Sequence, residues 1–282
     1  MIISDIYKNT VASFKAADIP EPENDARMMM EHILGVTRND LLVHADKEIE
    51  QNIDCYNSAV ERRCTREPLQ YILGTASFMG LDFKVSPAVL VPRADTEILV
   101  EEILKDIHSG SHILDMCTGS GCILISLLNY SNECSGVGVD LSADALEIAK
   151  ENAQTLIPDK EYCFINSDLF EGLDHNDRFD IIVSNPPYIA SAVIEELMPE
   201  VRDHEPRMAL DGTADGLYFY RKIVDNADVF LKSGGLLAFE IGYDQGEAVK
   251  QLMLDRGYNE VEIIKDYSDM DRVVKGIKAF HL

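Results

Sequence analysis

The chain has 282 residues, enough for one large domain or for a large and a small one, and its hydrophobic fraction of 46% is ordinary for a globular protein. Its formal charge of −25 argues against a protein that grips duplex nucleic acid, because such proteins neutralise phosphates with clustered lysine and arginine side chains. No apolar run approaches the roughly 18 residues that a membrane helix needs, and residues 1–8 show no signal-peptide pattern.

The six cysteines form neither a C-x-x-C pair nor a disulfide framework, and the seven histidines are scattered along the chain. We therefore expect a reduced, cytoplasmic protein without a metal site.

Residues 1–72 are expected to form four or five short helices, packed as a small bundle. The clearest helix start lies near Pro22, where proline and acidic residues share the first turn of a segment that Gly35 ends. Other helices are expected over residues 5–17, from 37 or 39 to 43, and over 49–66. In residues 73–92 an approximate strand alternation with glycines at turn positions predicts a hairpin that joins two domains.

From His112 onward strands and helices alternate, which is the signature of a doubly wound parallel sheet. Just before it, residues 91–97 (VPRADTE) open an amphipathic helix, in which Arg93 and Glu97 could pair or cap locally instead of contributing to a site. The last two predicted strands, residues 261–264 and 273–279, suit an antiparallel hairpin.

The first strand of the alternation, residues 113–116, runs into a glycine turn made of Cys117, Thr118, Gly119, Ser120 and Gly121. Glycines allow a tight turn and a close approach of the backbone to a ligand. The third glycine of the dinucleotide fingerprint is absent, because Leu124 stands in its place, and this disfavours NAD or FAD.

Two acidic residues follow the next two strands. Asp140 ends the second strand, about 20 residues after the glycine turn, where a carboxylate can accept the hydroxyls of a ribose. Asp168 and Leu169 follow the third strand, and they suit an adenine amino group and the face of its ring. Because the carboxyl ends of parallel strands meet at one edge of the sheet, the pattern predicts a nucleoside site without a phosphate cradle.

The fourth strand, residues 179–184, ends in Asn185, Pro186, Pro187 and Tyr188. Each proline fixes its own φ and keeps the residue before it extended, so the Asn185 side chain is presented from a stiff support. The plainer alternative is a strand followed by a proline-rich turn without chemistry.

Amide and aromatic amine nitrogens are poor nucleophiles, because their lone pairs are delocalised. The Asn185 side-chain oxygen and the Pro186 carbonyl could hold the N–H bonds of such a nitrogen, so that its emerging lone pair faces an electrophile. Tyr188 would lie against the flat face of the substrate group. We therefore predict catalysis by orientation, without a strong base. The segment after Tyr188 is expected to form a loop over the site, in which His204 is structural.

With these residues assembled, the sequence resembles the HemK/PrmC family, protein-(glutamine-N5) methyltransferases that act on peptide chain release factors. The resemblance runs nearly end to end and is carried by residues 69–74 (LQYILG), 91–97 (VPRADTE), 115–121 (DMCTGSG), 185–188 (NPPY) and 204–206 (HEP). The chain departs from the family pattern at Ala94, where proline is usual, and at Cys117, where glycine is usual.

The resemblance implies an α/β protein: a seven-stranded, Rossmann-like class I methyltransferase domain over residues 93–282, a helical domain over 1–72 that helps to recognise the substrate, and a β-hairpin linker over 73–92. It implies methyl transfer from S-adenosyl-L-methionine to the side-chain amide nitrogen of glutamine in the Gly-Gly-Gln motif of class I release factors, which act in translation termination. It implies cofactor contacts from residues 117–121, Asp140, Leu169 and Asn185, and glutamine contacts from residues 185–188. Asp168 remains a candidate for adenine from its position alone.

Two other functions are weighed against this one. An adenine-N6 DNA methyltransferase would use the same Asn-Pro-Pro-Tyr chemistry, but it would need a basic groove, which the acidic composition opposes. A nucleoside-binding adaptor would hold a partner without turnover. We expect a monomer without direct nucleic-acid or membrane partners.

Overall fold

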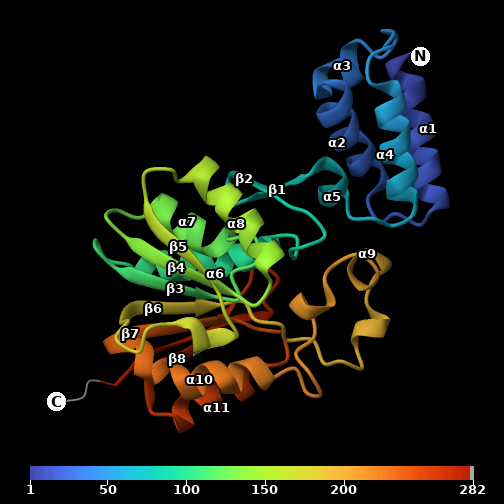
Figure 1. Ribbon diagram of the computed structural model, residues 1–282. Coiled ribbons are helices and arrows are strands. Elements are labelled where there is room, and N and C mark those ends of the chain that lie inside the picture. The colour runs from blue at the N-terminus through green and yellow to red at the C-terminus, as the bar shows by residue number, and fades with distance from the viewer. Residues whose placement is uncertain (280–282) are drawn as a thin grey trace. The chain divides into compact units, whose positions relative to one another are not determined.

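The computed structural model describes residues 1–279, and these form two compact units (Figure 1). Met1–Thr75 and Met198–His204 make up the first, which we call the helical unit. Ala76–Leu197 and the described residues from Glu205 onward make up the second, which we call the sheet unit.

The helices of the helical unit are α1 (Ile3–Ala16), α2 (Pro22–Leu34), α3 (Arg38–Val43), α4 (Ile53–Cys64), α5 (Leu69–Leu73) and α9 (Pro199–Arg202). Helices α1, α2, α4 and α5 bury side chains in the helical unit, whereas α3 and α9 have no buried residue. Phe14, Met29 and Met30 are fully buried in this core. Helix α4 begins later than the sequence predicts, because Asn52 takes a left-handed φ of 59° and its side chain donates to the Ile33 carbonyl at 3.1 Å.

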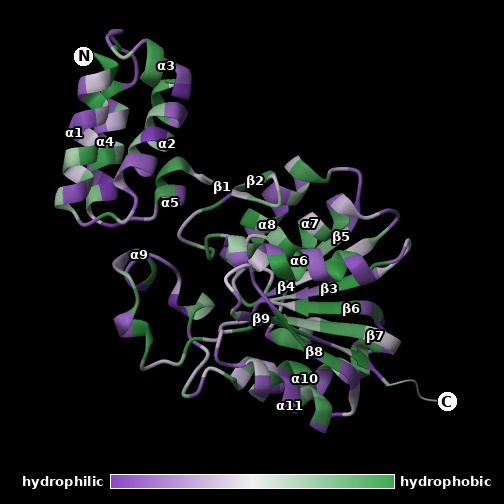
Figure 2. Cartoon of the chain, turned by 180° about the vertical axis from the view of Figure 1, so that it is seen from behind, coloured by the Kyte–Doolittle hydropathy of each residue, from purple (hydrophilic) through white to green (hydrophobic). Residues whose placement is uncertain are grey.

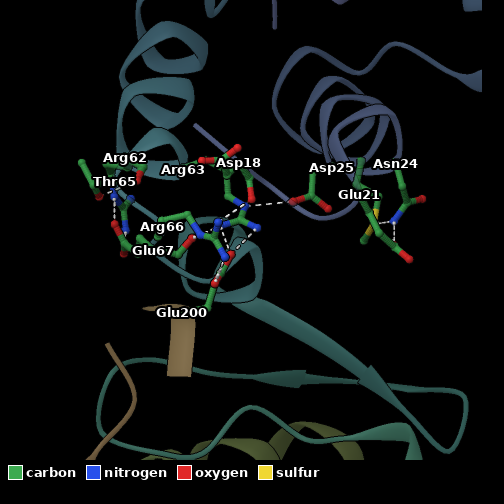
Figure 3. Close-up of polar contacts among 11 residues, drawn as sticks. Asp18, Glu21, Asn24, Asp25, Arg62, Arg63, Thr65, Arg66, Glu67 and Glu200 are labelled. Carbon is green, nitrogen blue, oxygen red and sulfur yellow. Dashed lines mark hydrogen bonds and ion pairs between the residues drawn. The ribbon is translucent and has the colours of Figure 1, made fainter. Parts of the chain in front are cut away.

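A buried group of charges lies in the helical unit (Figure 3). Arg63, only 5% exposed, donates from Nε to Asp25 at 2.8 Å and from Nη1 and Nη2 to Glu200 Oε1 at 3.2 Å each. The second oxygen of Glu200 accepts from Arg66 at 2.6 Å. Residues 198–204 are thereby tied to α2 and α4.

In the sheet unit, β1 (Thr75–Phe78) and β2 (Leu81–Lys84) form a two-stranded sheet. The turn between them is tight, since Met79 and Gly80 both have positive φ, at 50° and 72°.

A seven-stranded sheet with the order β5-β4-β3-β6-β7-β9-β8 forms the centre of the sheet unit. Its strands are β3 (His112–Met116), β4 (Ser135–Asp140), β5 (Glu161–Asn166), β6 (Phe179–Ser184), β7 (Leu231–Glu240), β8 (Tyr258–Lys265) and β9 (Asp271–Lys278). The first five in this order run parallel, and β9 is antiparallel to both of its neighbours. This confirms the predicted α/β class and the final antiparallel hairpin. Strand β7 begins at Leu231, and Gly234 and Gly235 lie within it.

Helices cover both faces of the sheet (Figure 1). Helices α6 (Ala94–Asp106), α7 (Cys122–Tyr130) and the end of α8 (Ala143–Leu156) pack on one face, and α10 (Tyr218–Phe230) and α11 (Gly246–Asp255) pack on the other. Residues of β6 therefore alternate: Ile181 and Val183 join the first core, and Ile182 joins the second. Figure 2 shows β6 and β7 largely in the hydrophobic colour, as expected for strands buried on both faces. Within residues 1–279, no helix is both long and apolar enough to cross a membrane.

Candidate active site

A cavity of about 360 Å³ lies where β3, β4 and β6 end, wholly within the sheet unit. Its volume falls in the range of small-molecule sites. Most of the residues predicted to bind the cofactor line it: Cys117, Thr118, Gly119, Ser120, Asp140, Asp168, Leu169 and Asn185. Pro187 also lines the cavity, whereas Gly121, Pro186 and Tyr188 lie outside its wall.

The glycine turn is folded back over the end of β3 by Asp115, which is completely buried. Its Oδ2 accepts from the Thr118 hydroxyl at 2.6 Å and from the Leu124 backbone at 3.3 Å. Burial raises the pKa of Asp115 to about 7, although these hydrogen bonds oppose the rise. Gly121 precedes α7 with a φ of 79°, and a Cβ there would lie 2.9 Å from Ile125 Cδ1. Gly121 therefore serves the close packing of the turn.

Cys117 takes a left-handed φ of 62°. Glycine adopts this conformation freely, whereas a residue with a Cβ is strained there by roughly 1–2 kcal/mol. The departure from the family's usual glycine therefore strains the backbone at the wall of the cavity. Burial also raises the pKa of the Cys117 thiol well above its usual range, so the side chain is a neutral thiol and not a reactive thiolate at neutral pH.

Asp140 is fixed by two backbone donors. Its Oδ2 accepts from Gly119 at 2.8 Å and its Oδ1 from Ser142 at 2.9 Å. Burial raises the pKa of Asp140, and these backbone hydrogen bonds oppose the rise. Each carboxylate oxygen accepts more than one hydrogen bond, so Asp140 can still receive two hydroxyl groups from the cavity.

On the other side of the cavity, Leu169 also has a left-handed φ, of 47°. It begins the short 3-10 helix η1 (Leu169–Gly172), which the Ser167 hydroxyl fixes by donating to the Leu169 carbonyl at 3.0 Å and accepting from the Gly172 backbone at 2.7 Å. A non-glycine residue keeps this conformation only where the surrounding structure holds it, and such residues cluster at binding sites.

The Asn-Pro-Pro-Tyr corner follows β6. Asn185 is half-buried and lines the cavity, and its Nδ2 donates to the Thr96 hydroxyl at 3.3 Å. Tyr188 turns inward: its hydroxyl donates to Glu240 Oε1 at 3.2 Å and its carbonyl accepts from Gln245 at 2.9 Å. The predicted stacking of Tyr188 on the substrate group therefore stays a prediction.

Two glycines fix the corner from outside. A Cβ on Gly212 would lie 2.7 Å from Tyr188 Cα, and one on Gly216 would lie 2.3 Å from the Tyr188 carbonyl oxygen. Both contacts are closer than real Cβ atoms allow, so the backbone can approach Tyr188 only where these residues are glycine.

The local pairing of Arg93 with Glu97, weighed as one alternative, does not occur. Arg93 instead donates to Glu205 at 2.5 Å, and Glu97 accepts from the Met79 backbone at 2.6 Å. His204 belongs to the helical unit, where its ring nitrogen lies 3.2 Å from the Thr65 carbonyl. Glu205 and His204 both lie outside the wall of the cavity.

Several residues of the cavity wall were not predicted: Thr96 from α6, and Ala88, Val89 and Leu90 from the segment before α6. The loop that was expected to lie over the site does contribute to the wall, through Pro206, Met208, Ala209 and Asp211. The apolar run 88–90 carries no pattern that distinguishes it from a surface loop, so no sequence signal could have assigned it to the site.

Comparisons with known proteins agree in both units. Residues 5–74 match the family described as the PrmC N-terminal domain, and residues 93–201 match the Methyltransferase small domain. A release factor glutamine methyltransferase from Caulobacter vibrioides is 43% identical over 267 residues, covering 94% of this chain and 92% of the relative. One from Fusobacterium nucleatum is 41% identical over 283 residues, covering 98% and 79%.

Among solved structures, the crystal structure of a methyltransferase from Pyrococcus furiosus superposes with a TM-score of 0.53 at 19% identity. The match covers 72% of this chain and 92% of that one, and it shows that the two share a fold.

Proposed function

Because the chain belongs to the family of release factor glutamine methyltransferases, we propose that it transfers a methyl group from S-adenosyl-L-methionine to a glutamine side-chain nitrogen of a peptide chain release factor. The glutamine of the Gly-Gly-Gln motif in class I release factors is the expected target. The observation that carries the proposal is that the fixed carboxylate of Asp140 and the carboxamide of Asn185 line one cavity.

The residues present fit the cofactor. Asp140 has lone pairs left for the two ribose hydroxyls, and a Cβ added at Gly119 would meet no protein atom within 4 Å, so the turn leaves open space on that side. Asp168 and Leu169 would receive the adenine amino group and ring. When bound, S-adenosylmethionine supplies a methyl carbon with a sulfonium leaving group.

Asn185 and Pro186 would orient the substrate glutamine. The Asn185 Oδ1 and the Pro186 carbonyl would accept hydrogen bonds from the two N–H groups of its amide, so that the nitrogen lone pair would be free for the methyl group. A nitrogen that gains the methyl carbon from the sulfonium, whose sulfur keeps the bonding pair, would become positively charged. Its N–H groups would then be stronger donors, so both acceptors would bind the transition state more tightly than the ground state. The nitrogen then releases one proton to solvent.

The helical unit is proposed to help recognise the release factor, which acts in translation termination and would be met in the cytoplasm. We propose that the chain works as a monomer and without direct nucleic-acid contact, in line with its charge of −25.

The test is mass spectrometry of a digested class I release factor after incubation with the chain and labelled S-adenosylmethionine. One added methyl group on the Gly-Gly-Gln glutamine is expected. Asn185→Ala should abolish methylation while the dissociation constant of the cofactor rises only modestly, whereas a nucleoside-binding adaptor would keep its partner function in that variant. Label in DNA oligonucleotides but not in the release factor would show that the substrate is wrong.

A further inference from the structure

Gln245 lies just before α11, outside the wall of the cavity, and its carboxamide joins three segments of the sheet unit. Its Nε2 donates to the Tyr188 carbonyl at 2.9 Å and to the Gly216 carbonyl at 3.4 Å, whereas its Oε1 accepts from the Gly242 backbone at 3.0 Å. These partners fix the orientation of the carboxamide, because a carbonyl can only accept and a backbone N–H can only donate. The amino end of Gln245 therefore faces the end of the Asn-Pro-Pro-Tyr corner.

Two buried glycines leave no room beside this carboxamide. A Cβ on Gly216 would lie 2.7 Å from Gln245 Nε2, and one on Gly242 would lie 3.0 Å from Gln245 Oε1. An N-cap side chain usually accepts a hydrogen bond from the first turn of its helix. Gln245 is the N-cap residue of α11, yet its side chain makes no such bond. The carboxamide therefore binds Tyr188, Gly216 and Gly242, and not the helix that it precedes.

The Asn-Pro-Pro-Tyr corner is held at both ends. At its start, Ser184 pairs with Met116 of β3, and the Ser184 hydroxyl donates to the Met116 carbonyl at 2.6 Å. At its end, Gln245 binds the Tyr188 carbonyl. The two prolines between these anchors fix their own φ and have no N–H, so few torsions of the segment can change. A displacement of the Tyr188 carbonyl is therefore passed along the stiff segment toward Asn185.

We infer that Gln245 is a positioning residue, which holds the Tyr188 carbonyl and, through it, the Asn185 side chain and the Pro186 carbonyl where the substrate amide needs them. This inference rests on the proposed function. A reacting group that is misplaced by about 1 Å can slow a reaction by roughly 100-fold. Because Gln245 does not line the cavity, its loss should act on the rate of methyl transfer and not on cofactor binding.

Gln245→Glu separates this role from a role in starting α11. One oxygen of the variant side chain can still accept from Gly242, but the other, when ionised, meets the carbonyl oxygens of Tyr188 and Gly216 without a hydrogen to donate. The repulsion should displace the end of the corner. A role in the helix predicts the opposite, since a negative charge near a helix N-terminus is stabilising. Gln245→Met removes the hydrogen bonds without adding repulsion, so its loss of rate should be smaller than that of Gln245→Glu.

The assays are run at pH 8, well above the ordinary glutamate pKa of about 4.3. They measure kcat and KM for release-factor methylation, and the dissociation constant and stoichiometry of cofactor binding by calorimetry. We expect kcat to fall roughly 10- to 100-fold in Gln245→Glu. In Gln245→Met it should fall roughly 3- to 10-fold, the scale of one lost hydrogen bond. Gln251→Glu is the matched control, because Gln251 is exposed on α11 and donates to Asp255, and its kcat should not change.

In both Gln245 variants the cofactor dissociation constant should change by less than about twofold, and the stoichiometry should match wild type, which shows that every molecule is folded. A merely structural role would lower kcat and the stoichiometry together. The inference is overturned if wild type methylates the glutamine and Gln245→Glu has a kcat within about twofold of it, if Gln245→Met is the slower variant, or if the stoichiometry falls in proportion to kcat; the proposed function then stands.

If Gln245→Glu fails to fold, Gln245→Met decides by itself, and a kcat within about twofold of wild type overturns the inference. If wild type leaves the release factor unmodified while cofactor binds, the proposed function fails and the inference with it.

Discussion

Replacing Arg63 with methionine should lower the free energy of unfolding of the helical unit by about 3–5 kcal/mol, the usual cost of removing one partner from a buried ion pair. Methionine keeps much of the aliphatic volume, so the loss reports the charge and its hydrogen bonds. Asp25 loses its cation within hydrogen-bond distance, at 2.8 Å, while Glu200 keeps Arg66 at 2.6 Å. The uncompensated Asp25 should therefore account for most of the loss.

The loss should depend on pH. Burial already raises the pKa of Asp25, and the Arg63 hydrogen bond and charge oppose the rise. Without Arg63 the folded-state pKa rises further, so the folded variant holds a proton that the unfolded chain releases. The penalty is therefore small at pH values below the ordinary pKa of aspartate and grows as the pH rises above the folded-state pKa of Asp25 in wild type.

Hydrogen exchange measured by mass spectrometry, with urea unfolding at pH 5 and pH 8, is the appropriate assay. Peptides from residues 3–73 and 198–204 should exchange faster in Arg63→Met, while those of β3 to β7 should not. Arg207→Met is the matched control, since Arg207 is 59% exposed, its partners Glu195 and Asp211 are 70% and 26% exposed, and pairs of an exposed arginine contribute at most about 1 kcal/mol. A loss for Arg63→Met no larger than that of the control would refute the reasoning.

Three further changes probe the cavity. Asp140→Ala should weaken binding of S-adenosylmethionine by roughly 1–3 kcal/mol, or about 5- to 150-fold in the dissociation constant, and calorimetry showing less than a twofold change would contradict the ribose assignment. Cys117→Gly should stabilise the chain by up to about 1 kcal/mol, because glycine relieves the backbone strain at a left-handed φ of 62°. The β-branched Cys117→Val should destabilise it. Equal thermal midpoints for the two variants would contradict the argument from strain. The pKa of Asp115 rises from 3.8 to about 7 on folding, so the folded chain keeps a proton that the unfolded chain loses. Between pH 4 and pH 8 the free energy of unfolding of wild type should therefore fall by up to about 4 kcal/mol relative to Asp115→Asn. Urea unfolding curves that give the same pH dependence for both proteins would contradict this.

Much of the sheet unit could be predicted because its signals are local. The β-branched run 179–184 and the turn at 117–121 are visible in short windows of sequence, and the convergence of their ends on one cavity follows from parallel pairing alone. The bundle of short helices could also be predicted, with errors of a few residues at the helix boundaries. One example is the start of α4, which a left-handed Asn52 sets.

The rest could not be predicted, because it depends on contacts between residues far apart in the chain. Nothing in the sequence around Thr96 indicates that its hydroxyl accepts from Asn185, and nothing around Glu240 indicates that it accepts from Tyr188, since both read as ordinary helix and strand residues. The inward turn of Tyr188 likewise follows from Gln245 and Glu240, two partners contributed by later elements. For the same reason the sequence could not predict that Arg93 donates to Glu205 and not to the nearby Glu97.

The position of β9 has a consequence for how the protein is made. Among the described strands β9 is the last to be synthesised, yet it is paired on both sides, with β7 and with β8. While a nascent chain still lacks residues 271–278, β7 has an open edge on that side, and such edges are templates for aggregation. A ribosome that stalls before residue 271 therefore leaves a product in which the β7 edge is unpaired and β8 lacks its neighbour in the sheet.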